Sequence, residues 1–480
     1  MHETLMNPAT RDVPSAASDL VVIGGGISGL VVARETVRLR PEWSVTVLEC
    51  EDTPGGTMRT ERVADCVCEW GPAGFLTNVP YTLDLALELG LGDRLLPACD
   101  AAENRYLWVR GALRPVPLKP PAFLKSDVLT LSGRARVLAE PLIPKRRTGT
   151  DESVFAFASR RIGTEAARVL VDAMVAGIYA GDSANLSLRA TFPRMIEMEE
   201  RYGSLIKAMM ALKKAKLKSG GPVGPGGVLT SFDNGMGVLV QSLAGALGSR
   251  LVNGTRVNRI SREGSEYVID GTVAGTSRTW RAKEVVLAVP SPIAAKLVEP
   301  FAQMLSTELA QIPYAGLSVV SLIYRRSQIR HALNGFGFLV PRDQGLRILG
   351  AIWAGSVFPA HVPQDRALLR VMLGGARDPE GPMLSETRSI DIAHGDVSKA
   401  LGGIDGAPMA TRMFRHAKAI PQYVLGHPER LERIERERSR YAGLHLAGNA
   451  YRGIGVNDCV RESRALAERI TSGVDAGTKS

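Results

Sequence analysis

The sequence is poor in cysteine and histidine. Its 480 residues include five cysteines, an odd number without a CxxC pair, which argues against a disulfide framework. Cys66 and Cys68 lie two residues apart and are expected to be buried thiols of a strand. The seven histidines are scattered without HxxH or HExxH spacing, so we expect no metal site.

Segments that would enter or cross a membrane are also missing. The apolar stretch 20–33 is shorter than a bilayer span and contains four glycines. The first 19 residues lack the basic, apolar and small-residue order of a signal peptide. We therefore expect a reduced, cytoplasmic protein that is not secreted and has no transmembrane span.

The composition is that of a folded globular protein. Apolar residues make up 45% and charged residues 22%, which excludes general disorder, collagen and coiled coil. At roughly 100–200 residues per domain, the length predicts two to four domains. The 59 basic and 49 acidic residues leave a net charge of +10, which favours an acidic partner: nucleic acid, anionic lipid or an anionic small molecule.

The clearest motif is a glycine-rich turn between a predicted strand, 19–23, and a predicted helix, 30–39. The turn reads GGGISG and fits GxGxxG with Gly24, Gly26 and Gly29. These glycines permit a tight turn, the approach of a pyrophosphate to the backbone, and close packing of helix on strand. The helix N-terminus would face the phosphates with free N–H groups.

The next segments define the dinucleotide. A second strand, 44–48, ends in Glu49, where an acid accepts hydrogen bonds from a ribose. A further glycine pair follows in 54–60, and Arg59 can neutralise a pyrophosphate through two hydrogen bonds. This GGxxRT arrangement resembles the FAD signature of the amine oxidase-like flavoprotein superfamily, so FAD is the expected cofactor.

Later segments predict a flavin fold assembled from distant parts of the chain. Strands are expected at 251–260, 285–290 and 444–449, and a helix after the last would point its N-terminus at the flavin pyrimidine. The predicted fold is α/β, with a Rossmann-like FAD-binding domain of discontinuous segments, an α+β substrate domain and a helical membrane-docking lobe. The expected boundaries are a flexible extension at 1–18, the FAD-binding domain at 19–100, 228–292 and 420–476, the helical lobe at 101–218, a Gly/Pro loop at 219–227, and the substrate domain at 293–419.

From about Asp19 to Ile470 the chain resembles the oxygen-dependent protoporphyrinogen oxidase family. The first and last matching segments are shared with flavin oxidases broadly, whereas the middle ones are more specific to this family. In order they are GGGISGL (24–30), EWGPAGFL (69–76), LRPVPLKPPAFLKSD (113–127), AGIYAGD (176–182), LSLRATFP (186–193), NGFGFLVP (334–341), VMLGGARDP (371–379), AIPQYVLGH (419–427) and LAGNAYRGIGVNDC (446–459).

The resemblance implies oxidation of protoporphyrinogen IX to protoporphyrin IX in heme biosynthesis. Six electrons would leave in three hydride transfers to flavin N5, and O2 would reoxidise the flavin with H2O2 as by-product. The flavin carries this chemistry, so no catalytic side chain is assigned. The alternatives are oxidation of coproporphyrinogen III, which has four carboxylates, and an amine oxidase or carotenoid desaturase of the same superfamily.

The resemblance also implies a substrate site for a tetrapyrrole with propionate tails. Arg114 would pair with a propionate. Phe358 would stack on a pyrrole ring, and Leu339 would press a ring from the other side. The remaining members are two wall residues, Phe336 and Met372, and Gly177, which would let the backbone approach the substrate.

For the flavin, the resemblance implies contacts from both ends of the chain. Ala73-Gly74 departs from the Asn-Ser of some family members, so no catalytic role carries over to that position. His416 stands where many members have Trp, which we interpret as a packing substitution. The predicted cofactor-binding residues are Gly24, Gly25, Gly26, Ile27, Ser28, Gly29, Glu49, Cys50, Gly56, Thr57, Arg59, Gly71, Pro72, Ala73, Gly74, Val257, His416, Ile454, Gly455 and Val456.

The basic excess is confined to one block. Residues 101–218 hold 21 basic and 11 acidic residues, so the rest of the chain is neutral. This block contains Arg114, the apolar run 120–124 and the basic cluster 145–147. In the resembled family this region docks on the membrane, and basic groups beside apolar ones suit an anionic lipid surface. We therefore expect a peripheral protein of the cytoplasmic membrane that uses O2, does not bind nucleic acid and can form a homodimer.

Overall fold

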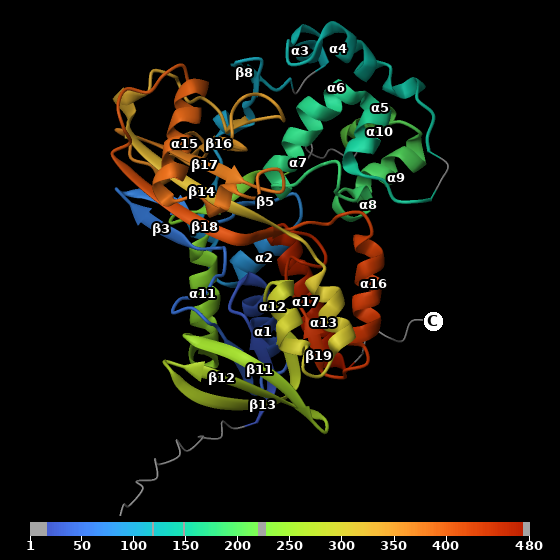
Figure 1. Cartoon of the computed structure of the whole chain (residues 1–480), viewed down its shortest axis with the longest axis vertical. Coiled ribbons are helices and arrows are strands. Elements are labelled where there is room, and N and C mark those ends of the chain that lie inside the picture. Colours follow the sequence, from blue (N-terminus) through green and yellow to red (C-terminus); the bar gives the residue numbers. More distant parts are fainter. Residues whose placement is uncertain (1–16, 118–119, 147–148, 219–226, 474–480) are drawn as a thin grey trace, which may run out of the picture.

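The structure, a computed structural model, describes residues 17–117, 120–146, 149–218 and 227–473. Within them lie two seven-stranded sheets and a helical lobe (Figure 1). The predicted N-terminal extension up to residue 16, and the predicted Gly/Pro loop up to residue 226, lie outside the described residues. No helix of these ranges combines the length and the apolar character that crossing a bilayer requires.

The first sheet joins parallel strands from distant parts of the chain. β10, β2, β1, β13 and β19 lie side by side in that order, and β13 also belongs to an antiparallel meander with β12 and β11. The predicted Rossmann-like sheet of discontinuous segments is therefore confirmed. The strands are β1 (Ser18–Ile23), β2 (Val45–Leu48), β10 (Leu251–Val252), β11 (Thr255–Glu263), β12 (Glu266–Val273), β13 (Thr276–Leu287) and β19 (Leu444–Leu446).

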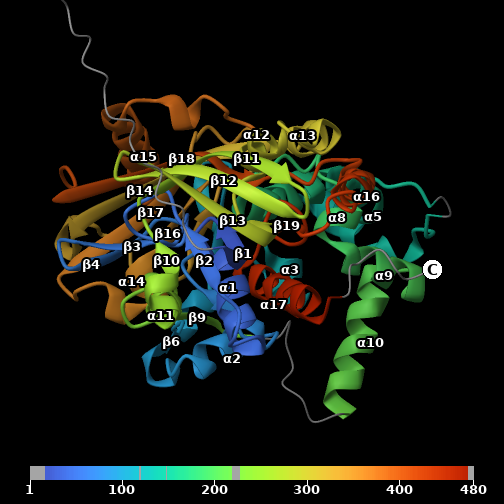
Figure 2. The same ribbon diagram turned by 90° about the horizontal axis from the view of Figure 1, so that it is seen from below.

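Helices cover both faces of this sheet, which is why β1 is apolar throughout. Leu20 and Val22 pack in the core beneath α1, α11 and α17, whereas Val21 and Ile23 pack in the core beneath α12, α13 and α16. Figure 2 shows α1 and α17 side by side against the sheet. The helices are α1 (Ile27–Leu39), α2 (Tyr81–Glu88), α11 (Gly237–Leu247), α12 (Ser291–Val298), α13 (Gln303–Ala310), α16 (His427–Arg438) and α17 (Val456–Ser472).

The second sheet has the order β18-β14-β17-β16-β15-β7-β8. One face packs beneath α15 (Glu386–Ala400) through residues such as Val320 and Leu369. The opposite face meets the hairpin of β3 (Thr60–Val63) and β4 (Cys66–Glu69), and also α7 (Asp172–Tyr179). The strands are β7 (Arg105–Val109), β8 (Ala112–Pro115), β14 (Tyr314–Arg325), β15 (Gly337–Leu339), β16 (Gly350–Trp353), β17 (Arg366–Gly374) and β18 (Ala410–Pro421).

Cys66 and Cys68 are fully buried in β4, as expected for thiols with a packing role. Burial raises the pKa of each thiol to about 11, so both stay protonated at neutral pH.

Residues 101–218 are predicted to form a helical lobe. The structure differs at the start of this block, where β7 and β8 are strands of the second sheet. The rest is helical, and α7 connects the lobe to that sheet. The lobe is centred on the buried Arg161, which pairs with Glu140 and Glu199. Its helices are α3 (Pro120–Lys125), α4 (Leu131–Leu138), α5 (Val154–Ile162), α6 (Thr164–Ala166), α7 (Asp172–Tyr179), α8 (Leu188–Thr191), α9 (Pro193–Tyr202) and α10 (Leu205–Lys218). The short elements elsewhere are α14 (Ala354–Val357) and the three-stranded sheet of β5 (Phe75–Leu76), β9 (Leu229–Phe232) and β6 (Leu95–Pro97).

Candidate active site

The glycine turn between β1 and α1 combines close packing with one open position. A Cβ on Gly24 would lie 2.5 Å from the Ala288 carbonyl oxygen, and one on Gly29 would lie 2.0 Å from the Gly24 oxygen. A Cβ on Gly26 would meet nothing within 4 Å. The structure therefore leaves space beside Gly26, where the motif expects the pyrophosphate.

The first turn of α1 has no side-chain cap. Gly26 is its N-cap, and Ile27 and Ser28 begin the helix without a side chain that accepts their backbone N–H groups. Unsatisfied N–H groups and the positive end of the helix dipole are the features that bind phosphate at helix N-termini.

Glu49 lies at the end of β2, directly beside the glycine turn. Its Oε2 accepts the Gly25 N–H at 2.6 Å, its Oε1 accepts the Glu51 N–H at 2.9 Å, and the Cys50 Sγ lies 3.4 Å from Oε1. The carboxylate is buried, yet its Oε2 keeps a further lone pair for a ligand hydroxyl. Val257 lies near on β11, because the Thr255 N–H donates to the Glu49 carbonyl at 2.7 Å.

The second glycine pair packs against the first. The Gly55 N–H donates to the Gly25 carbonyl at 2.8 Å, and a Cβ on Gly56 would lie 3.7 Å from the Gly26 Cα. Arg59 donates to the Thr53 carbonyl, but its Nε is buried without a partner. A buried donor without an acceptor is costly, so this guanidinium is suited to an anion that the protein alone does not supply.

The loop from Gly71 to Gly74 connects β4 to β5 and is held close to its neighbours. A Cβ on Gly71 would lie 2.2 Å from the Thr57 carbonyl oxygen. A Cβ on Gly74 would lie 2.7 Å from the Thr230 carbonyl oxygen. Pro72 and Ala73 are half-buried between them. The loop and Thr57 therefore form one surface with the second glycine pair.

The N-terminus of α17 lies beside that of α1. Gly455 is its N-cap without a side-chain cap, and Ile454 and Val456 flank it. The Cys459 thiol, one turn into α17, hydrogen bonds with Ser28 in the first turn of α1. Two uncapped helix N-termini therefore face one region, which suits a molecule with negative charge at two places.

The predicted substrate residues fall into two groups. Leu339 of β15 and Met372 of β17 are both register partners of Gly350 on β16, so the two side chains share one sheet face. A Cβ on Gly177 of α7 would lie 2.9 Å from the Leu339 Cδ2, so α7 covers this face. The second group, Phe336 and Phe358, packs in a separate cluster.

Arg114 lies on the same row of the sheet as Leu339, because Leu107 is the register partner of both. Its guanidinium forms an ion pair with Asp127, and its Nε donates to the Val109 carbonyl at 3.1 Å. The Asp127 side chain is 64% exposed. The sequence offered no sign of this partner, which is 13 residues away and meets Arg114 only after β8 and α3 have turned the chain back.

The structure adds a buried charge pair that the motifs did not indicate. Glu69 precedes the loop at 71–74 and accepts from the Thr60 hydroxyl and the Met236 N–H, both at 2.7 Å. Burial raises the pKa of Glu69 to about 7. Arg370 of β17 is its nearby cation and donates to the Gly71 carbonyl. A charged residue at an inward position of the apolar strand LLRVML was the one signal for it.

His416 supports the same segment from β18. Its Nε2 lies 3.0 Å from the Trp70 carbonyl oxygen, and burial lowers the pKa of the ring, so it is neutral near pH 7 and donates this hydrogen bond. The rings of His416 and Trp70 are tilted, with centroids 6.4 Å apart. The second sheet therefore holds two consecutive carbonyl groups at the start of the loop, through His416 and Arg370.

A cavity of about 630 Å³ lies where the helical lobe meets β14 and β18. Its lining includes Asp182, Ala315, Arg415 and Gln422. None of the predicted cofactor or substrate residues within the described ranges lines it, so the predicted site and this cavity are separate features.

The family of the chain follows from its sequence profile together with this geometry. The model of the flavin-containing amine oxidoreductase family matches residues 27–471, a range that begins at the first residue of α1 and includes the N-terminus of α17. The chain belongs to the flavin-containing amine oxidoreductase family. It is accordingly an FAD-dependent oxidoreductase, as the glycine turn, Glu49 and Arg59 predicted.

Similar members of this family include porphyrinogen oxidases. The chloroplast protoporphyrinogen oxidase of Nicotiana tabacum is 30% identical over 98% of this chain and 88% of its own length. The coproporphyrinogen III oxidase of Bacillus subtilis is 28% identical over 93% of this chain and 96% of its own. Human protoporphyrinogen oxidase is 30% identical over 93% of this chain and 97% of its own length. The predicted resemblance is therefore confirmed.

Solved structures agree on the fold. A crystal structure from Exiguobacterium sp. 255-15 is 26% identical, has a TM-score of 0.83 and covers 96% of this chain and all of its own. Reduced UDP-galactopyranose mutase, at 15% identity and a TM-score of 0.73, shares the fold alone. The space at Gly26, the unpartnered Nε of Arg59 and the two uncapped helices fit the dinucleotide that this family carries.

Proposed function

We propose that this chain oxidises protoporphyrinogen IX to protoporphyrin IX in heme biosynthesis. The observation that carries the proposal is the similarity to protoporphyrinogen oxidases along almost the whole chain, which includes the substrate sheet as well as the flavin domain. When bound, the flavin accepts the electrons that leave the substrate. The protein contributes by positioning the substrate, excluding water and stabilising charge.

In this proposal the row Leu339, Gly350 and Met372 is one wall of the macrocycle site. Gly350 carries no side chain, so this row has a shallow depression between the apolar side chains of Leu339 and Met372, which suits a flat ring. Gly177 keeps α7 close to Leu339 and closes the site against water. The N-terminus of α17 would stabilise negative charge on a bound flavin.

The carboxylates of the substrate require cations, and Arg114 is proposed for one of them. Its partner Asp127 is largely exposed, so a propionate can replace it at a small cost in free energy. Oxidation of coproporphyrinogen III is the second candidate, favoured by the similarity to the Bacillus subtilis enzyme. We prefer protoporphyrinogen IX, because a single arginine of the resembled family's carboxylate clamp is present and this substrate has two carboxylates rather than four.

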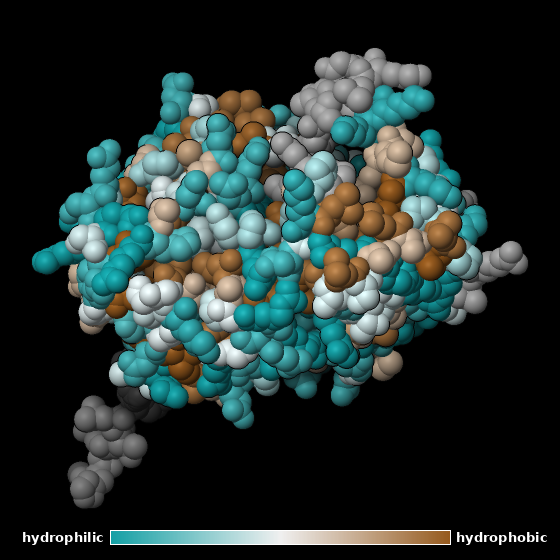
Figure 3. All heavy atoms as spheres, turned by 90° about the horizontal axis from the view of Figure 1, so that it is seen from above, coloured by the Kyte–Doolittle hydropathy of each residue, from teal (hydrophilic) through white to brown (hydrophobic). Residues whose placement is uncertain are grey.

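The proposal includes O2 as the electron acceptor and peripheral attachment to the cytoplasmic face of an anionic membrane, with a homodimer as the assembly. Figure 3 views the end of the molecule that carries α3 and α4 in Figure 1, and apolar patches lie there between hydrophilic ones. Exposed leucines gather in this part of the lobe: Leu124, Leu131, Leu138 and Leu142. Apolar side chains beside basic ones are typical of peripheral binding.

The test uses the purified, flavin-loaded protein in air. Each porphyrinogen is offered separately, and porphyrin fluorescence and H2O2 are followed together. We expect a faster rise with protoporphyrinogen IX and H2O2 in a fixed ratio to porphyrin. Faster turnover of coproporphyrinogen III would favour the second candidate, and no fluorescence with either substrate would contradict both.

A further inference from the structure

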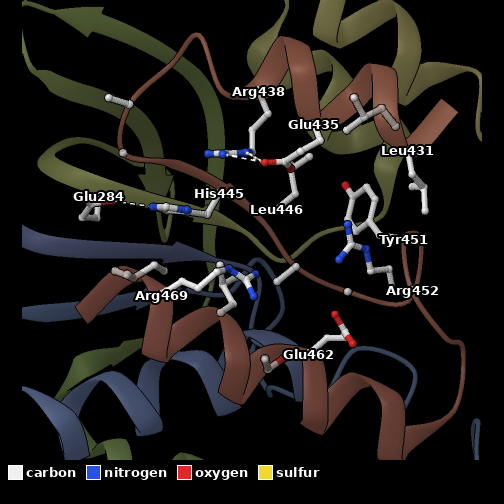
Figure 4. A pocket seen from close by; sticks show the side chains of 18 of the residues that line it. Glu284, Leu431, Glu435, Arg438, His445, Leu446, Tyr451, Arg452, Glu462 and Arg469 are labelled. Carbon is white, nitrogen blue, oxygen red and sulfur yellow. Dashed lines mark hydrogen bonds and ion pairs between the residues drawn. The ribbon is translucent and has the colours of Figure 1, made fainter. Parts of the chain in front are cut away.

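A second cavity lies at the open edge of the first sheet, between α16, β19 and α17 (Figure 4). Its volume is about 440 Å³, which is enough for a small organic molecule. The cavity is located where the two cores on either side of the sheet meet. Leu431 and Leu446 come from one core, and Leu466 and Ile470 come from the other.

This cavity is distinct from the proposed flavin and substrate sites. None of the residues that line it belongs to the glycine turn, to Glu49, to the loop at 71–74 or to the predicted substrate residues. The nearest approach in sequence is Arg452, two residues before Ile454.

Three arginines reach the cavity from three different elements. Figure 4 shows Arg438 on α16, Arg452 on the segment after β19 and Arg469 on α17. Arg438 is buried and satisfied, because it pairs with Glu435 at 2.8 Å and donates to the Leu444 carbonyl at 2.8 Å. The guanidinium groups of Arg452 and Arg469 have no hydrogen bond or ion pair within the described part of the chain.

Each acidic residue of the cavity already has a partner. Glu435 pairs with Arg438, and the Glu284 carboxylate lies 2.6 Å from the His445 Nε2. Glu462 pairs with Arg461 at 3.0 Å. None of these three carboxylates forms an ion pair with Arg452 or Arg469, although Glu462 and Glu435 lie close enough to Arg469 to raise its pKa.

The charges of the arginines also act on one another. Burial lowers the pKa of Arg469, and the neighbouring Arg452 and Arg438 lower it further, whereas Glu462 and Glu435 oppose this shift in part. Like charges that share a cavity raise its positive potential, and a bound anion relieves this repulsion. A guanidinium offers two parallel N–H donors, which match a carboxylate or phosphate.

We propose that this cavity is a binding site for a small organic anion, with a phosphate or carboxylate group between Arg452 and Arg469. The apolar body of the ligand packs against Leu431, Leu446 and Leu466, which line the inner wall. The site goes beyond the proposed oxidation, because it shares no residue with the substrate wall or the flavin turn.

The test measures binding to the flavin-loaded protein at low salt by calorimetry, with three probes: inorganic phosphate, phenyl phosphate and benzoate. Phenyl phosphate is expected to bind more tightly than inorganic phosphate, since it adds an apolar body. Tighter binding of phenyl phosphate than of benzoate identifies a phosphate ligand, and the reverse order identifies a carboxylate ligand. Absence of binding by all three at about 10 mM would overturn the proposal.

Variants locate the site. The double substitution Arg452→Gln with Arg469→Gln is expected to weaken binding at least about tenfold, because each removes a hydrogen-bonding charge. Arg436→Gln removes an exposed charge from α16 outside the cavity and is the matched control. Arg469→Lys keeps the charge without the paired donors and is expected to bind with intermediate affinity. Equal affinity in the double variant and the wild type, with flavin content unchanged in both, would overturn the assignment.

Discussion

Arg370 of β17 and Glu69 of β4 show how single residues hold the loop at 71–74. Arg370→Met removes the donor to the Gly71 carbonyl and leaves Glu69 buried without its nearby cation. We expect a loss of about 3 kcal/mol or more in the free energy of unfolding, and a fall in flavin content. Urea unfolding and the flavin absorbance per protein measure the two effects.

The matched variants of this pair separate charge from packing. Arg370→Lys keeps a cation and is expected to lose less stability than Arg370→Met. Adding Glu69→Gln to Arg370→Met removes the unpaired charge and is expected to restore part of the stability, as a double-mutant cycle detects. Additive losses would contradict a direct interaction between the two side chains.

Glu69 also predicts a pH dependence. Its folded pKa of about 7 lies above the ordinary value of 4.5, so between these values the folded state holds a proton that the unfolded state releases. This contribution to stability is complete below pH 4.5 and is lost as pH rises to about 7, by roughly 3 kcal/mol. His427 acts in the opposite sense, because burial lowers its pKa to about 4. Urea unfolding at pH 5 and pH 8 gives the free energy of unfolding of the wild type and of Glu69→Gln, and the difference between the two proteins isolates the contribution of Glu69. An equal difference at both pH values would contradict the prediction.

At the scale of elements, the β1–α1 turn allows folding and flavin binding to be separated. Gly26 has an extended backbone, with φ of −74°, and an open position for a Cβ. Gly26→Ala is therefore expected to change the free energy of unfolding of the flavin-free protein by no more than about 0.5 kcal/mol. If phosphate occupies that space, flavin affinity falls at least about tenfold, because the added methyl group takes its place. Calorimetric titration of the flavin-free protein with FAD measures the flavin affinity of the variant and of the wild type.

Gly29→Ala is the matched control for this turn. Its Cβ would lie 2.0 Å from the Gly24 oxygen, so the loss is expected in folding itself, visible as a lower melting temperature without flavin. Unchanged flavin affinity in Gly26→Ala would show that the open space at the turn is not the phosphate site.

For the whole molecule, the uneven charge distribution predicts how it approaches a membrane. Replacing Leu131, Leu138 and Leu142 with Gln removes three exposed apolar side chains from the lobe that carries the entire net charge. We expect vesicle binding to weaken at least about tenfold at unchanged flavin content, because each leucine buries apolar area in the interface. Sedimentation with anionic vesicles measures it, and added salt is expected to weaken the wild type as well.

The control triple variant replaces Met304, Met383 and Met409, which are exposed outside the lobe, with Gln. Equal vesicle binding by the two triple variants would show that the lobe is not the docking part. The basic cluster 145–147 belongs to the same prediction, although residue 147 lies outside the described ranges.

Particular residues show why some of the site was predictable from sequence. Gly24, Gly26, Gly29 and Glu49 act through local geometry, because a strand, a tight turn and a helix N-terminus are made by consecutive residues. The motif could therefore predict the strand–turn–helix geometry of this segment without knowledge of distant contacts. Arg370 could not be assigned in the same way, since it lies 299 positions from the carbonyl that it binds.

The sequence by itself determined the flavin cofactor, the family and the Rossmann-like sheet, because local hydrogen-bonding and packing requirements are encoded in short motifs at both chain ends. Tertiary structure alone decided that β7 and β8 extend the second sheet, that Arg114 meets Asp127, and that Arg370 and His416 hold the loop at 71–74. It also brought Arg452 and Arg469 to one cavity. These pairings depend on burial and on strand register between distant segments, and neither property can be read from one segment alone.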